Sequence, residues 1–159
     1  MAGLYFEQFE VGQRFAHAPR RTVTETDNLL ITALTMNPAP VHLDAEYCKG
    51  TAFGAPLVNS VFTLGLMVGI SVYDTTLGTT VANLGWEKVA FTKPVFVGDT
   101  LRIETTVVAK RESRSHPDRG IVTFEHRAFN QRSEEVASCL RAAMMLKQPA
   151  ASGSSRGSA

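Results

Sequence analysis

The chain has 159 residues, of which 19% are charged, and its formal net charge is +1. This length fits one domain with a substantial core, and the near-neutral charge without a long basic run excludes nucleic acid as a main partner. The charged fraction lies below the usual quarter or so, which indicates that a second subunit covers part of the surface.

The cysteines and the two ends of the chain bear on its location. Cys48 and Cys139 lack metal-ligand spacing, and the first residues have neither a basic segment nor the apolar stretch of a secretory signal. Both features predict a protein of the reducing cytoplasm. Residues 148–159 are small and polar, so we predict a disordered tail after a single domain of residues 1–147.

The first elements predicted along the chain are a strand and a helix. Residues 13–23 have the polar ends of an exposed strand. Thr24 then provides a helix cap, and Asp27 completes an acidic first turn. Leucines and alanines follow at helical spacing, so we expect this helix to end near Met36.

Two prolines define the next segment. Pro38 and Pro40 cannot lie in a helix interior and push their predecessors to extended geometry. Residues 37–42 are therefore predicted to form a stiff, extended turn. A short helix is expected over residues 44–49, and a loop rich in Gly and Pro over residues 51–57.

Residues 50–73 carry no charged side chain, and the rest of the chain is predicted to be arranged around them. From Ser60 to Val72 apolar side chains recur on all sides, which is typical of a helix buried in a core. A membrane span is disfavoured, because a window of the required length includes Pro56 and several polar residues. Residues 58–60 provide a side-chain cap, so this helix start offers unpaired N–H groups to a ligand oxygen.

Beyond Asp74 the sequence becomes rich in Val, Thr, Phe and Ile with much alternation, which predicts strands with short connections. Such strands form an antiparallel sheet, and one apolar helix with one sheet predicts an α+β domain in which the sheet curls around the helix. A second copy would then close its open edge. The expected strands are residues 79–84, 87–92, 99–110, 120–130 and 135–146.

His42 is the first candidate for chemistry, because the prolines before it fix its backbone and polar residues surround it. Capping of the short helix, or a bond to a backbone carbonyl, is an equally good interpretation. His17, His116 and His126 are weaker candidates, and strand-face or surface positions explain the last two. No metal-binding cluster, serine-hydrolase motif or phosphate-binding glycine loop occurs, so no metal site is predicted.

The chain resembles a known family at four motifs. Residues 37–44 (NPAPVHLD), Phe53–Gly54, residues 58–60 (VNS) and residues 94–101 (PVFVGDTL) are similar to motifs of the MaoC-like (R)-specific enoyl-CoA hydratases and dehydratases. The resemblance extends over roughly residues 5–147. It implies the hot-dog fold, in which an antiparallel sheet wraps a long central helix.

The resemblance also implies catalytic residues. In the family, an Asp/His pair activates water for addition to a 2-enoyl thioester, and a backbone N–H at the helix start binds the thioester oxygen. The matching positions are Asn37, His42 and Ser60. Asn37 stands where the family has its catalytic Asp; an amide can orient water but cannot take its proton, so the acid/base role falls on His42. Ser60 replaces a glycine, which leaves the backbone donor in place.

The pattern around His42 resembles a subgroup acting on branched C5 dicarboxylyl-CoA thioesters such as mesaconyl- or itaconyl-CoA. A substrate carboxylate requires a cation, for which Arg20, Arg21 and Arg127 are candidates, although each is also expected as a solvated strand residue. The charged loop of residues 111–119 is the predicted contact of the CoA phosphates. The full set of expected substrate-binding residues is Val41, Phe53, Gly54, Asn59, Arg111 and Arg114.

The function implied is therefore an acyl-CoA hydratase or dehydratase, a homodimer or higher homo-oligomer without membrane contact. No cofactor is expected, since CoA is part of the substrate. Two alternatives stay open at this point. One is a hot-dog thioesterase, which the motif around His42 disfavours; the other is a non-catalytic acyl-CoA-binding or regulatory protein that has lost its Asp at Asn37.

Overall fold

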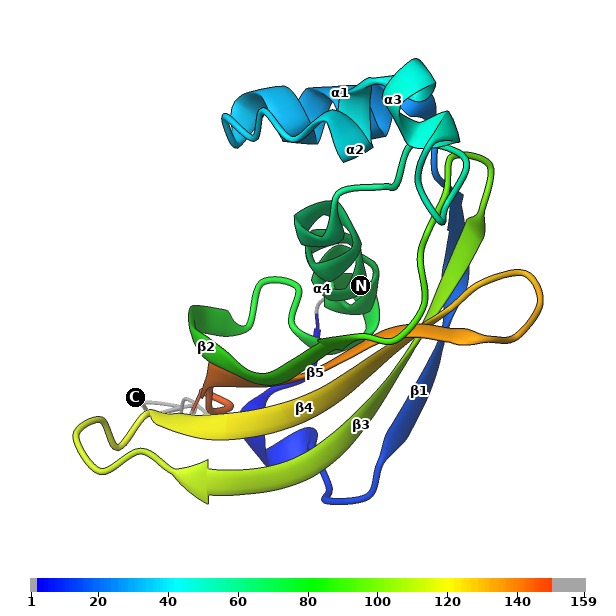
Figure 1. Ribbon diagram of the computed structural model, residues 1–159. Coiled ribbons are helices and arrows are strands. Elements are labelled where there is room, and N and C mark those ends of the chain that lie inside the picture. Colours follow the sequence, from blue (N-terminus) through cyan, green and yellow to red (C-terminus); the bar gives the residue numbers. More distant parts are fainter. Residues whose placement is uncertain (1–2, 150–159) are drawn as a thin grey trace, which may run out of the picture.

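The computed structural model describes residues 3–149. A curved antiparallel sheet wraps around the helix α4, Ser60–Thr75 (Figure 1). The five strands lie in the order β1-β3-β4-β5-β2, and every neighbouring pair is antiparallel. This confirms the α+β architecture predicted from the sequence. Apart from its first two residues, the predicted disordered tail of residues 148–159 lies outside the described part. The strands are β1 Arg14–Thr22, β2 Thr80–Phe91, β3 Thr100–Glu112, β4 Arg119–Phe129 and β5 Glu135–Leu146.

Three helices form a separate layer beyond the start of α4 (Figure 1): α1 Glu25–Leu34, α2 Pro40–Leu43 and α3 Ala45–Lys49. The predicted cap of α1 is confirmed, because the Thr24 hydroxyl accepts a hydrogen bond from the Asp27 N–H at 3.2 Å. The extended turn predicted over residues 37–42 is wrong in its second half. Pro40 is the first residue of α2, where its fixed φ suits a helix start and its missing N–H costs nothing.

Strand β2 is continuous, whereas the sequence predicted two strands separated at Gly85. The pairing of β2 with β5 shifts register three times, between Thr80 and Ala82, between Asn83 and Gly85 and between Glu87 and Ala90. Gly85 has φ +147° and Lys88 has φ +49°, so the irregularity is absorbed by bulges instead of ending the strand. The remaining predicted strands match β3, β4 and β5 to within two residues.

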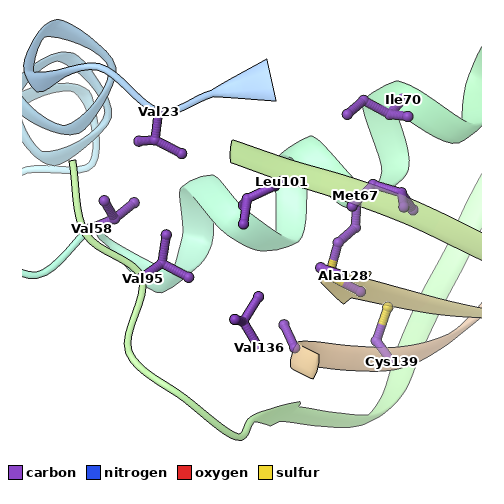
Figure 2. Packing of buried hydrophobic residues seen from close by; sticks show 11 residues of the cluster. Val23, Val58, Met67, Ile70, Val95, Leu101, Ala128, Val136 and Cys139 are labelled. Carbon is purple, nitrogen blue, oxygen red and sulfur yellow. The ribbon is translucent and has the colours of Figure 1, made fainter. Parts of the chain in front are cut away.

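The main hydrophobic core lies between α4 and the concave face of the sheet (Figure 2). Met67 and Ile70 of α4 are buried there against strand residues such as Leu101. The opposite side of α4 is open in the single chain, since Val61 is 51% and Tyr73 66% exposed. The sequence predicted that α4 is buried on all sides; within the single chain this holds only for the face that packs against the sheet. No helix within residues 3–149 has both the length and the apolar character needed to cross a bilayer.

A polar layer, buried except for Asp74, crosses the sheet beneath the C-terminal end of α4. His17 Nδ1 bonds Asp74 Oδ2 at 2.7 Å, and its Nε2 lies 2.8 Å from the Thr105 hydroxyl. The same hydroxyl lies 2.9 Å from Nδ1 of His126. Burial, together with the nearby charge of Arg141, lowers the pKa of His126 to about 3, so this side chain is neutral at physiological pH. Asp74 is the last residue but one of α4, so this layer lies at the opposite end of the helix from Ser60.

Candidate active site

His42 lies in α2, and its ring is fixed by one hydrogen bond to the loop that precedes α4. Its Nδ1 lies 2.9 Å from the backbone oxygen of Leu57. A carbonyl oxygen can only accept, so the neutral imidazole must carry its hydrogen on Nδ1. Nε2 then presents a lone pair, and within residues 3–149 it has no hydrogen-bond partner. The half-buried His42 is thus set up to take a proton through Nε2.

Asn28 of α1 holds the loops around His42 together. This side chain is 2% exposed, and its amide nitrogen donates to the backbone oxygens of His42 and Leu57, both at 3.1 Å. Its amide oxygen accepts the Asn59 N–H at 2.8 Å. One side chain therefore ties α1 to α2 and to the start of α4, a role that the sequence analysis missed.

The start of α4 leaves one backbone donor free. Asn59 caps the helix, since its side-chain oxygen accepts the Val61 N–H at 3.0 Å and its backbone oxygen accepts the Phe62 N–H at 3.0 Å. The Asn59 N–H is taken by Asn28. In the described part of the chain the Ser60 N–H alone among these four donors has no partner. The partial positive charge of the helix start adds to its affinity for an oxyanion.

His42 and Ser60 share the wall of a cavity of ≈ 360 Å³. This volume is that of a small-ligand site, and the walls are largely apolar. Thr63, which is 1% exposed, adds a hydroxyl that was not predicted. The cavity thus places a proton acceptor and an oxyanion donor on one largely apolar wall. Its walls are formed by His42, Phe53, Leu57, Val58, Ser60, Thr63, Phe91, Thr92, Lys93, Pro94 and Val95.

A second cavity of ≈ 350 Å³ reaches His42 from the side of α1 and α3. Glu25 and Asn28 lie on its wall, with apolar residues of the loops that precede α4 and β3 around them. Because His42 belongs to both walls, the two spaces meet at this residue. A long thioester has room on either side of the histidine.

The structure places the other predicted residues of this region as follows. Phe53 lies on the wall of the first cavity, whereas Gly54 lies in the exposed loop with φ +69°. The Val41 backbone oxygen accepts the Leu57 N–H at 2.9 Å. Asn37 lines neither cavity; its side-chain oxygen accepts the Ala39 N–H at 3.0 Å and shapes the turn before α2. Its role in positioning water stays a prediction.

The predicted cations lie away from His42 within the chain. Arg111 is near the end of β3 and Arg114 follows in the hairpin to β4, at the opposite end of the sheet from α1–α3 (Figure 1). At about 3.3 Å per residue, Arg111 lies roughly 35 Å along the strand from Thr100. Their contact with CoA stays a prediction. Arg20, Arg21 and Arg127 also line neither cavity.

The class of protein follows from this sheet and helix together with a solved structure. The chain superimposes with a TM-score of 0.83 on a Mycobacterium tuberculosis protein described as a double hotdog fold. The two are 26% identical, and the match covers 92% of this chain and 45% of the other. The protein has a hot-dog fold, as expected.

The family follows from the sequence matches. The model of the MaoC-like domain matches residues 6–128, and the chain belongs to this family. A mesaconyl-CoA hydratase from Cereibacter sphaeroides is 35% identical over 150 residues, which cover 94% of this chain and 43% of the relative. An (R)-specific enoyl-CoA hydratase from Aeromonas caviae is 31% identical over 129 residues, 79% of this chain and 87% of the relative. The chain thus spans less than half of the first relative and nearly the full length of the second.

Proposed function

We propose that the protein is an acyl-CoA hydratase or dehydratase, which adds water reversibly to the double bond of a 2-enoyl-CoA. The observation that carries this proposal is the shared cavity of His42 Nε2 and the free N–H of Ser60. The hydratase names of the relatives support it.

The proposed reaction uses these two groups in order. His42 Nε2 takes a proton from water as the water oxygen attacks C3 of the enoyl group. Electrons of the double bond move toward the thioester, and the negative charge on its oxygen is stabilised by the Ser60 N–H and the start of α4. The proton on Nε2 is then transferred to C2, which restores the neutral imidazole. Dehydration is the same sequence reversed.

The reaction needs no cofactor, because addition of water transfers only protons and hydroxide, and CoA enters and leaves as part of the substrate. Cys48 and Cys139 are both buried free thiols, which supports the cytoplasmic location predicted from the sequence.

The direct test compares thioesters with the purified protein. We expect hydration of mesaconyl-CoA or itaconyl-CoA to exceed that of crotonyl-CoA and of a longer enoyl-CoA. Mass spectrometry detects added water, and a thiol reagent detects free CoA. Added water without free thiol supports the proposal. Release of thiol would identify a thioesterase, and binding without either reaction would identify a non-catalytic acyl-CoA-binding protein.

We further propose that the protein is at least a homodimer closed through β2 and α4. Strand β2 is an edge of the sheet, and several of its large apolar side chains are exposed, among them Leu84 at 47% and Trp86 at 44%. Val61 and Tyr73 are further exposed apolar side chains, on the open side of α4. A second copy would also supply the second hot-dog half that is found in double hot-dog proteins.

Sedimentation velocity at micromolar concentration is expected to give a dimer or a larger closed oligomer. Trp86→Arg places a charge in the proposed interface and should shift the distribution toward monomer. Val11→Arg, at an exposed apolar residue in the turn before β1, the other edge strand, is the matched control and should leave the distribution unchanged. A monomeric wild-type protein would refute the assembly.

A further inference from the structure

One cation lies beside the proposed catalytic groups, and no role in the reaction has been assigned to it. Among residues 3–149, Lys93 is the single Lys or Arg on the wall of either cavity that His42 reaches. It follows the end of β2, and its N–H is directed at the Val136 oxygen of β5 at 3.5 Å. The wall around it is formed mainly by apolar residues such as Phe91, Pro94 and Val95.

The ammonium group of Lys93 is held in place by Glu134. Nζ donates to Glu134 Oε1 at 2.7 Å, while Asn130 Nδ2 and Arg132 Nε each donate to Oε2 at 2.8 Å. Hydrogen bonds from Asn130, Lys93 and Arg132 lower the pKa of Glu134 to about 2, so this anchor stays ionised. The positive charge of Arg132 compensates the negative charge of Glu134. An ammonium group has three donors; the Lys93 side chain is 51% exposed, and Glu134 is the one partner of its Nζ among residues 3–149, so two donors are accessible to a ligand.

The chemistry of a dicarboxylyl thioester places an anion near this site. In mesaconyl-CoA the free carboxylate is attached to C3, the carbon that water attacks. That carboxylate must therefore enter the cavity when the water is within reach of His42. A carboxylate in a largely apolar cavity is costly unless a cation or several donors compensate for its lost hydration.

We propose that Lys93 binds the free carboxylate of the acyl group and so selects dicarboxylyl-CoA over neutral enoyl-CoA substrates. This inference rests on the proposed hydratase function, since it places the acyl group in the cavity of His42. Lys93 contacts substrate but takes no part in the proton transfers.

The test is Lys93→Gln with two thioesters of the same shape. In 2-methylcrotonyl-CoA a methyl group stands where mesaconyl-CoA has its carboxylate. We expect the substitution to raise KM or Kd for mesaconyl-CoA about 10- to 100-fold, the range for a lost hydrogen bond to a charged group. Values for 2-methylcrotonyl-CoA should change little, and Lys93→Arg should restore part of the affinity. An equal loss for both thioesters would overturn the proposal in favour of a CoA phosphate contact.

Glu134→Gln separates substrate binding from a structural role of the ion pair. This variant breaks the pair with Lys93 but leaves the ammonium group in place, so KM for mesaconyl-CoA should be unchanged or lower. If both variants raise KM alike, Lys93 acts through the loop structure and the proposal is wrong. Lys147→Gln, whose partner Glu112 lies at the far end of β3, is the control.

Binding measurements distinguish this proposal from the proposed function. A wild-type protein that prefers mesaconyl-CoA through Lys93 but hydrates neither thioester would refute the hydratase and support the carboxylate site. Hydration of both thioesters with equal KM would support the hydratase and refute the carboxylate site. Wild-type protein that binds neither thioester would overturn both.

Discussion

Replacement of His42 by glutamine is expected to lower kcat for hydration by about 10²- to 10⁴-fold, the usual contribution of a positioned acid/base group. Glutamine can still donate a hydrogen bond to the Leu57 oxygen, but it cannot take a proton from water at neutral pH. KM should change little, since the Ser60 N–H and the cavity walls remain. Steady-state kinetics with the preferred enoyl-CoA measure both parameters.

The control for His42→Gln is Glu10→Gln, which changes an exposed side chain before β1 that lines neither cavity and lies outside the charged loop between β3 and β4. This variant should keep wild-type activity. Thermal unfolding should show that His42→Gln is folded, because Asn28 still satisfies the Leu57 oxygen. Activity within tenfold of wild type would place the base elsewhere, and Glu25 on the wall of the second cavity would be the next residue to replace.

The features that the sequence predicted well are those set by neighbouring residues. A cap needs only a side chain and an N–H two or three residues away, so Thr24 and the segment of residues 58–60 indicated helix starts that the structure confirms. Alternation likewise predicted β3, β4 and β5. Gly85 misled because a glycine can either end a strand or form a bulge, and pairing with β5 decides between them.

The features that the sequence did not predict depend on residues far apart in the chain. His17, Asp74, Thr105 and His126 meet only when the sheet closes over the end of α4. No sequence pattern marks Lys93, because its place on the cavity wall with Ser60 depends on how β2 and α4 pack. Asn28 gave no usable signal, because only one of the residues three and four positions away from it, Ile31, is apolar.

Substitution of Asn28 by alanine is expected to have the largest effect on stability. It leaves the His42 oxygen and the Asn59 N–H without their partners, at a cost of about 1–3 kcal/mol for each buried group. We therefore expect a loss of about 3 kcal/mol or more in the free energy of unfolding. At roughly 2–4 °C per kcal/mol for a chain of this size, Tm should fall by about 10 °C. Denaturant titration and calorimetry measure the two values.

The same substitution should also lower kcat at temperatures well below its Tm, because Asn28 sets the position of His42 relative to the start of α4. Asn28→Asp provides the matched comparison: it keeps an acceptor for the Asn59 N–H but turns a carboxylate oxygen toward the oxygens of His42 and Leu57. Repulsion between these acceptors should make Asn28→Asp as unstable as Asn28→Ala. If the aspartate variant matched wild type in stability and kcat, the amide nitrogen would have no part in holding His42, and the histidine would be positioned by α2 and Leu57 alone.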